Sequence, residues 1–116
     1  MPAPADRGAT ADSAALTQLL NICIDQADRL RDQNEVLWRQ FNSRLALVDV
    51  EVIMADGEPF NSDRHDATGR EATTDASRHM TVATTELVGY RRNGRYLRRP
   101  KVVVYRADLD QAGTAG

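Results

Sequence analysis

Residues 13–48 contain neither proline nor glycine, and this stretch constrains the fold more than any other part of the 116-residue chain. Its apolar residues, together with one asparagine, recur at alternating intervals of four and three, which places them on one side of an α-helix. We therefore expect one continuous helix over 13–48, about 50 Å long at 1.5 Å per residue. The seam consists of Leu16, Leu20, Cys23, Ala27, Leu30, Asn34, Leu37 and Phe41.

An apolar seam of this length needs a partner. Only 41% of the residues are hydrophobic and 5% aromatic, and small cores of this kind are often supplemented by disulfides, metals or oligomerisation. Cys23 is the only cysteine, which excludes an internal disulfide, so we expect a homodimer. Asn34 on the seam favours a parallel, in-register pair, because only then do the two amides meet. The alternative is a break near residues 31–34, which gives a helical hairpin that packs on itself.

Beyond the helix the pattern changes to that of strands. Residues 50–54 alternate well enough for one strand, and 55–58 form a turn. The polar stretch 61–78 predicts a long surface loop with a short strand inside, and the β-branched residues of 80–88 predict another strand. One helix followed by about four to six short strands gives an α+β fold, with the two classes segregated along the chain.

Residues 89–106 predict a β-hairpin with a concentrated positive charge. The stretch holds seven of the chain's 15 Lys and Arg residues and no acidic residue. Asn93 and Gly94 form the strongest two-residue turn signal, because both central positions of a type I′ turn need φ > 0. Pro100 then ends one strand before 102–105 starts another, since proline cannot donate to a central ladder. The basic residues are Arg91, Arg92, Arg95, Arg98, Arg99, Lys101 and Arg106.

Composition leaves three interpretations of this basic hairpin open. The first is a solvated strand face that protects a sheet edge from pairing. The second is nucleic-acid binding, with arginines on phosphates and with Tyr90, Tyr96 and Tyr105 as stacking surfaces. The third is a docking surface for a protein, for which Arg and Tyr are favoured anchor residues.

Side chains that carry out catalysis are not grouped in any recognisable motif. His65 and His79 lack the matched ligands of a zinc site. Neither a Gly-x-Ser-x-Gly elbow nor a glycine-rich phosphate loop occurs in the sequence. We therefore expect a protein that is not an enzyme and that holds no metal and no cofactor.

The two ends of the sequence differ in composition from the middle. Residues 1–12 and 107–116 are rich in small and polar residues with little apolar content, and we expect both to be disordered tails. No hydrophobic run is long enough to span a membrane, and the first residues lack the basic start and apolar core of a signal peptide. We expect a cytoplasmic protein without membrane contact.

Two motifs follow the helix in a recognisable order. Residues 49–53, which include Val50 and Ile53, lead into Phe60, His65 and Ala67. The second motif comprises Gly89, Tyr90, Arg95, Leu97, Arg98, Pro100, Val102 and Val104. In this order and at this spacing the motifs resemble those of the GrpE family, the nucleotide-exchange factors of DnaK-type chaperones. The resemblance covers about half of the chain, and a helix of the right kind precedes it.

The chain also departs from the family pattern. Asn61 and Ser62 stand where the family has Asp-Pro, and Arg99 is inserted before Pro100. The helical part is shorter than the family's and lacks its long N-terminal paired helix, whereas the motifs of the β-domain are largely retained.

The resemblance implies a small dimeric exchange factor that binds the ATPase domain of a DnaK-type chaperone and speeds ADP release. It implies a dimerisation segment over 13–48 and a GrpE-like β-domain over 49–106. Arg95 is its best single partner contact, because the family's hairpin arginine faces the ATPase domain. Further motif positions are Tyr90, Arg98 and Val104 in the candidate contact, and Phe60, His65, Gly89 and Pro100 in the structural frame.

A function of another class remains open beside this one. A coiled-coil adaptor with a basic docking hairpin would bind nucleic acid or another protein without exchange activity. Steep salt dependence of binding to generic DNA would favour the adaptor. The resemblance itself implies a protein partner, no nucleic acid and no cofactor.

Overall fold

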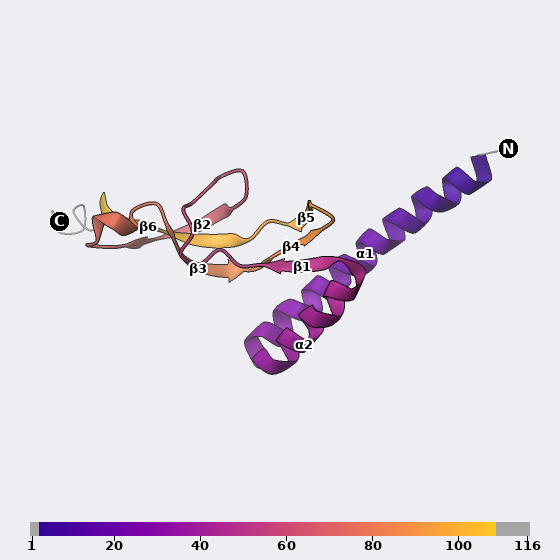
Figure 1. Cartoon of the computed structure of the whole chain (residues 1–116), viewed down its shortest axis with the longest axis horizontal. Coiled ribbons are helices and arrows are strands. Elements are labelled where there is room, and N and C mark those ends of the chain that lie inside the picture. The colour runs from indigo at the N-terminus through magenta and orange to yellow at the C-terminus, as the bar shows by residue number, and fades with distance from the viewer. Residues whose placement is uncertain (1–2, 109–116) are drawn as a thin grey trace. The chain divides into compact units, whose positions relative to one another are not determined.

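The structure, a computed structural model, describes residues 3–108. The chain divides into two compact units, Met1–Arg44 and Leu45–Gly116. The first unit is helical, and the second holds the strands (Figure 1). This order is the α+β fold that the sequence predicts, with helices first and strands after them.

Two helices replace the single continuous helix. α1 spans Ala3–Gln33 and α2 spans Glu35–Leu45. The chain reverses between them, so that α2 runs back along α1 in Figure 1. The expectation of one helix over 13–48 is therefore wrong, and the helical hairpin that was its alternative is the arrangement found.

Asn34 ends one helix and begins the next. Its backbone N–H donates to the Leu30 carbonyl at 2.7 Å, and its own carbonyl accepts from the Trp38 N–H at 2.9 Å. The side-chain Oδ1 accepts from the backbone N–H of Leu37 at 3.1 Å, so Asn34 is the N-cap of α2. A short side-chain acceptor is favoured there because it satisfies an amide that has no partner within the helix. The residue expected on a dimer seam instead interrupts the helix.

One stripe of α1 is withdrawn from solvent. Leu20, Ile24 and Ala27 are spaced four and three apart and are at most 6% exposed. Trp38 of α2 is buried as well, and the guanidinium of Arg31 lies 5.6 Å from the centre of its ring. Two antiparallel helices give this pattern when each covers the apolar stripe of the other. The hairpin thereby supplies cover that the sequence had assigned entirely to a second chain.

α1 also begins earlier than expected. The sequence predicted a disordered tail over 1–12, whereas residues 3–12 are helical. Four of these ten residues are alanine, the best helix former, and Pro4 stands in the first turn, where its missing N–H costs no hydrogen bond. Of the predicted tail at 107–116, only the first two residues lie within the described part of the chain.

The first of two three-stranded sheets carries the basic hairpin. Its central strand is β4 (Gly89–Arg92), which pairs antiparallel with both neighbours. The neighbours are β1 (Val50–Ile53) and β5 (Arg95–Arg98). A short 3₁₀ turn, Ala46–Val48, leads from the helical unit into β1.

The second sheet has β6 (Lys101–Arg106) at its centre. β2 (Asp66–Ala72) pairs parallel with β6, and β3 (Val82–Leu87) pairs antiparallel with it. β2 and a 3₁₀ turn, Ala76–Arg78, occupy much of the stretch predicted as a polar loop. β2 is mostly exposed and alternates weakly, so its sequence resembles that of a loop although its backbone pairs with β6 on both sides of an irregularity between Ala67 and Gly69.

The core of the strand unit lies on one face of the second sheet. Ala55, Val82, Val102 and Val104 form a cluster that is at most 3% exposed, and Phe60 packs against it. Val82 and Val104 are partners across the β3–β6 ladder, so the two strands contribute side chains to the same face. The segment that follows β1 thus covers part of this sheet.

Gly89 joins the two sheets at a point of close approach. A Cβ placed on Gly89 would lie 2.6 Å from Cδ of Pro100 and 2.9 Å from the Arg98 carbonyl oxygen. Any side chain there would force the backbone apart, so glycine is required by packing against buried Pro100. Two of the four motif residues assigned to the structural frame, Gly89 and Pro100, therefore pack closely against each other.

Candidate partner interface on the basic hairpin

The hairpin of β4 and β5 closes with the turn that the sequence predicts. Asn93 and Gly94 have φ values of 52° and 78°, and Arg92 pairs with Arg95 across the ladder. Positive φ at both central residues is the signature of the type I′ turn, whose twist matches that of the strands. The turn prediction is confirmed, and it places Arg95 directly after the tip.

Most of the basic side chains on this hairpin are tied to the strand unit itself. Arg91 Nε lies 2.7 Å from Oε1 of Glu51, its partner across the β1–β4 ladder. Arg92 Nε donates to the Val48 carbonyl at 2.9 Å. The sequence did not predict the Glu51 contact, because the register of β1 against β4 is set by a sequence-distant pairing. Local charge counting therefore overstates the free positive charge.

Arg98 and Tyr90 form a structural pair. Arg98 donates to the Val88 carbonyl from Nε at 3.0 Å and from Nη2 at 2.7 Å. Its guanidinium lies 5.7 Å from the centre of the Tyr90 ring, and Tyr90 is fully buried. Val104 is 3% exposed. Three of the four residues expected at the partner contact are thus engaged in the packing of the strand unit itself.

Arg99 and Arg106 have carboxylate partners. Arg99 Nη2 lies 3.1 Å from Oδ1 of Asp66, and Nη1 donates to the Ser62 carbonyl at 3.1 Å. Arg106 meets Asp108 through two contacts, Nε to Oδ1 at 3.0 Å and Nη2 to Oδ2 at 2.5 Å. The hydrogen bond to Asp108 raises the pKa of Arg106 and lowers that of the carboxyl.

Arg95 differs from these arginines. Its side chain is exposed, and across residues 3–108 no side-chain hydrogen bond or ion pair involves it. It projects from the start of β5, beside a tight turn that limits backbone movement. A rigidly placed, unneutralised guanidinium offers a planar fork of donors to a carboxylate or a backbone carbonyl of another molecule. Arg95 is therefore the hairpin residue best placed for a partner contact.

The Phe60–His65 motif fixes a loop rather than forming a reactive site. His65 is 4% exposed, and its Nδ1 accepts from the backbone N–H of Asn61 at 3.1 Å. The ring centres of Phe60 and His65 are 5.9 Å apart, and the Phe60 N–H donates to the Met80 carbonyl at 2.8 Å. Burial lowers the pKa of His65, against a smaller opposing effect of Glu58. In the described chain no group of three or more His, Cys, Asp or Glu side chains could hold a metal ion.

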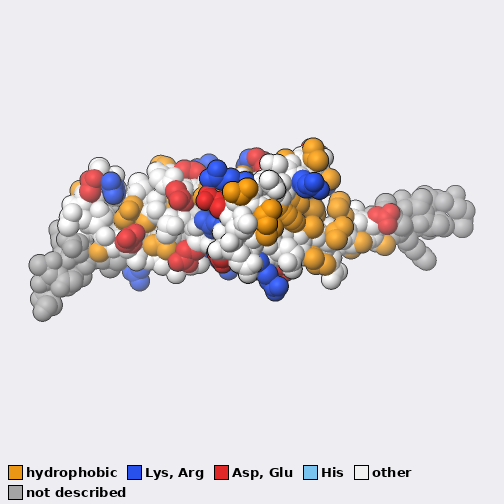
Figure 2. Space-filling model, turned by 90° about the horizontal axis from the view of Figure 1, so that it is seen from below, with side chains coloured by type: hydrophobic (Ala, Val, Ile, Leu, Met, Phe, Trp, Pro, Cys, Tyr) orange, Lys and Arg blue, Asp and Glu red, His pale blue; other side chains and the backbone are white. Residues whose placement is uncertain are grey.

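The predicted dimerisation residues range from buried to exposed. Leu20 and Ala27 are buried, Cys23, Leu30 and Phe41 are half-buried, and Asn34 is exposed at the helix break. Leu16 and Leu37 are 38% and 46% exposed. Figure 2 shows hydrophobic side chains gathered over the helical unit. Other large apolar residues with exposed side chains on these two helices are Leu19, Ile22 and Val36.

Comparison with known protein families identifies the family to which this chain belongs. The family model described as GrpE matches residues 12–106, which is most of the chain and includes both helices and all six strands in part or in full. The chain belongs to the GrpE family. The GrpE motifs in the strand unit are thus parts of a match that also reaches into the helical hairpin.

Curated GrpE-family relatives agree with this assignment. "Protein GrpE" of Nitrosococcus oceani is 39% identical over 75 residues, covering 65% of this chain and 35% of that protein. "Protein GrpE" of Pseudomonas entomophila is 30% identical over 87 residues, covering 75% of this chain and 47% of that protein. A Pseudomonas aeruginosa relative of the same name is 32% identical over 81 residues, covering 70% and 43%. The chain spans about a third to a half of the length of these relatives.

Within residues 3–108 no helix combines the length and the apolar character that crossing a membrane requires.

Proposed function

We propose that this chain binds the ATPase domain of a DnaK-type chaperone and accelerates the release of ADP. Membership of the GrpE family over residues 12–106 supports the activity, and the exposed, unpaired guanidinium of Arg95 supports the contact. Arg95 is the observation that carries the proposal, because it is the motif residue that the fold itself does not use.

Acceleration of this kind needs no catalytic residue. A protein that binds the open form of a nucleotide-binding cleft more tightly than the closed form shifts the cleft toward opening. By linkage, the exchange protein weakens nucleotide binding by a certain ratio, and nucleotide weakens the binding of the exchange protein by the same ratio. Arg95 contributes by tightening the complex with the open form, and the strand unit provides the rigid body on which it is carried.

We also propose that the active form is a homodimer. Leu16, Leu19 and Ile22 on α1, with Leu37 on α2, expose apolar surface that a second helical hairpin covers in the dimer. The pairing no longer rests on Asn34 at a seam, because that residue caps α2.

Arg95→Ala tests the proposed contact. We expect it to weaken binding to a DnaK-type ATPase domain by about 1–3 kcal/mol and to slow factor-stimulated ADP release, because a desolvated arginine anchor is lost. Stopped-flow release of a fluorescent ADP analogue measures the rate, and circular dichroism checks that the fold is unchanged.

Arg91→Ala is the matched control for Arg95→Ala. It removes the same charge from the same hairpin, but the Arg91 guanidinium is already neutralised by Glu51. We expect a much smaller effect on ADP release. Equal effects of the two substitutions would indicate diffuse charge attraction and contradict a specific Arg95 contact. If the wild-type chain leaves the rate of ADP release unchanged with every DnaK-type partner tested, the exchange activity itself is excluded.

A further inference from the structure

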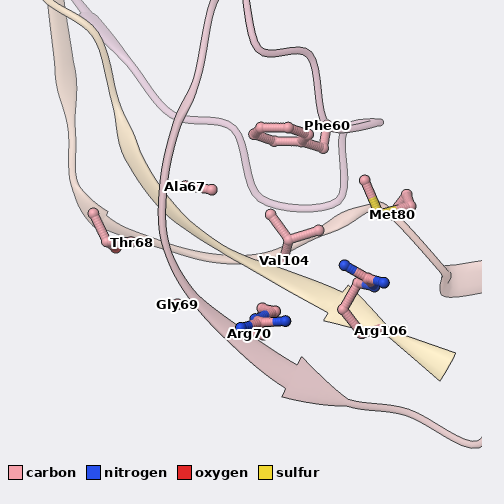
Figure 3. Close-up of a pocket in the computed structure, with 8 residues that line it drawn as sticks. All are labelled: Phe60, Ala67, Thr68, Gly69, Arg70, Met80, Val104 and Arg106. Atoms are coloured by element: carbon pink, nitrogen blue, oxygen red, sulfur yellow. The ribbon is translucent and has the colours of Figure 1, made fainter. Parts of the chain in front are cut away.

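The β2–β6–β3 sheet carries a cavity whose lining combines residues of the GrpE motifs with Arg70, Met80 and Arg106, which lie outside those motifs. Its volume is about 450 Å³. Phe60 and Met80 lie on one side of it, Arg70 and Arg106 on the other, and Val104 between them (Figure 3). The cavity is open because the segment carrying Phe60 covers only part of the sheet face to which Val104 contributes.

The two sides of the cavity differ in chemistry. Phe60, Met80 and Val104 give it an apolar wall, and no acidic side chain lines it. Arg106 is already neutralised by Asp108, because the two carboxylate oxygens accept hydrogen bonds from Nε and Nη2 of the guanidinium. Arg70 pairs with Val104 across the β2–β6 ladder, is exposed, and makes no side-chain hydrogen bond or ion pair with any residue of the described chain. The site therefore joins an apolar wall to an uncompensated positive charge.

Met80 supplies an independent indication that the cavity is built for contact. Its φ of 64° lies in the left-handed region that side-chain-bearing residues rarely adopt. Hydrogen bonds hold it there on both sides, from its N–H to the Tyr105 carbonyl at 2.9 Å and from the Phe60 N–H to its carbonyl at 2.8 Å. Its side chain remains 39% exposed instead of being buried in the core. Strained residues that present an exposed side chain at a cavity are characteristic of binding sites.

We propose that this cavity binds an apolar side chain flanked by carboxylates on an acidic segment of a partner protein. The apolar side chain enters between Phe60 and Met80, where a thioether adapts its shape to different occupants. A neighbouring carboxylate pairs with Arg70, whose planar donors suit that group. The site is on the β2–β6–β3 sheet and Arg95 is on the β1–β4–β5 sheet, so substitutions at Arg70 and at Arg95 test the two contacts one at a time.

The test uses the full chain and three blocked pentapeptides. The first has a central leucine with two glutamates on each side, the second replaces the glutamates by glutamines, and the third replaces the leucine by alanine. We expect amide chemical-shift changes around Phe60, Arg70 and Val104, and we expect them to saturate at the lowest concentration with the first peptide. Affinity for the glutamine and alanine peptides should fall by about tenfold, because each lacks one half of the recognised group.

Two variants separate binding from folding. Arg70→Gln should lower the affinity for the leucine–glutamate peptide by about tenfold. Met80→Gly removes the side chain that the peptide contacts, but it relieves the positive φ, so the melting temperature should stay level or rise while the affinity falls by a similar factor. Lys101→Gln is the control, because it removes one charge from β6 at a position that alternates with Val102 and Val104.

Several results would overturn the proposal. Equal losses in Arg70→Gln and Lys101→Gln would assign the attraction to diffuse charge. Equal affinity for the leucine and alanine peptides would show that the apolar wall does not contribute to binding. Shifts confined to the helical unit, or no shifts at millimolar peptide, would place the binding elsewhere or exclude it.

Discussion

Single residues in this chain are often committed to the fold even where their chemistry suggests an interface. Arg91, Arg92 and Arg98 lie on the exposed-looking basic hairpin, yet each is bonded to a group of the same unit. Tyr90 has the residue type of an interface anchor, but its side chain is fully buried. What distinguishes Arg95 and Arg70 is not their charge but the lack of any partner for that charge within residues 3–108.

His65 makes the stability of the strand unit depend on pH. Burial lowers its pKa below the ordinary value of 6.5, so the folded chain holds it neutral, with Nδ1 as an acceptor for Asn61. Its contribution is fully present above pH 6.5. As the pH falls below that value the unfolded chain binds the proton first, so stability falls until the folded-state pKa is also passed.

We expect urea denaturation to show a lower free energy of unfolding at pH 5.5 than at pH 7.5, by more in the wild type than in His65→Gln. Proton NMR of the His65 ring should give a titration midpoint below 6.5. An unchanged pH profile in His65→Gln, or a midpoint above that value, would contradict the inferred neutral histidine.

At the scale of elements, the helical hairpin depends on a short connection made without glycine or proline. The sequence could not separate it from a continuous helix, because Asn34 suits both a polar position on a heptad seam and an N-cap. Tertiary packing decides between a continuous helix and a hairpin, because Trp38 and the Leu20–Ala27 stripe are buried when α2 turns back. A repeat of four and three indicates an apolar stripe but does not say which helix covers it.

Substitution at Asn34 distinguishes the two roles. Asn34→Ala removes the Oδ1 acceptor for the Leu37 amide and should destabilise the helical unit by about 0.5–2 kcal/mol. Asn34→Asp keeps an acceptor at the same place and should be close to the wild type. Thermal melting followed by circular dichroism at 222 nm measures both. Higher stability in Asn34→Ala would mean that the side chain is a costly polar group in an apolar interface and not a cap.

Strand elements were predictable where they carried their own signals. The Asn93–Gly94 turn and the break at Pro100 follow from backbone chemistry that acts locally. β2 was expected only as a short strand within a loop, because its residues are largely polar and exposed, and its pairing partner β6 is distant in sequence. The cavity beside Arg70 could not be predicted for the same reason, since it exists only once β2 lies against β6.

The whole molecule exposes more apolar surface on its helices than one chain can cover. Leu19 is 56% exposed and Ile22 is 52% exposed, which is the basis of the proposed homodimer. We expect sedimentation at micromolar concentration to show a dimer, and Leu19→Glu combined with Ile22→Glu to shift it toward the monomer. Because neither side chain is buried within the chain, helicity at 222 nm should change little. A wild-type monomer under these conditions would contradict the proposal.

The place of β6 in its sheet has a consequence for how the chain is made. β6 is the last strand of the described chain, and it is the central strand on which both β2 and β3 depend. During synthesis these two strands leave the ribosome without their pairing partner and remain open-edged until Lys101–Arg106 emerges. This sheet can therefore be completed only after β6 has emerged, whereas the helical unit can form earlier from local contacts. A nascent chain cut short before Lys101 would retain the helices and the hairpin sequence but would expose two unpaired strands to aggregation.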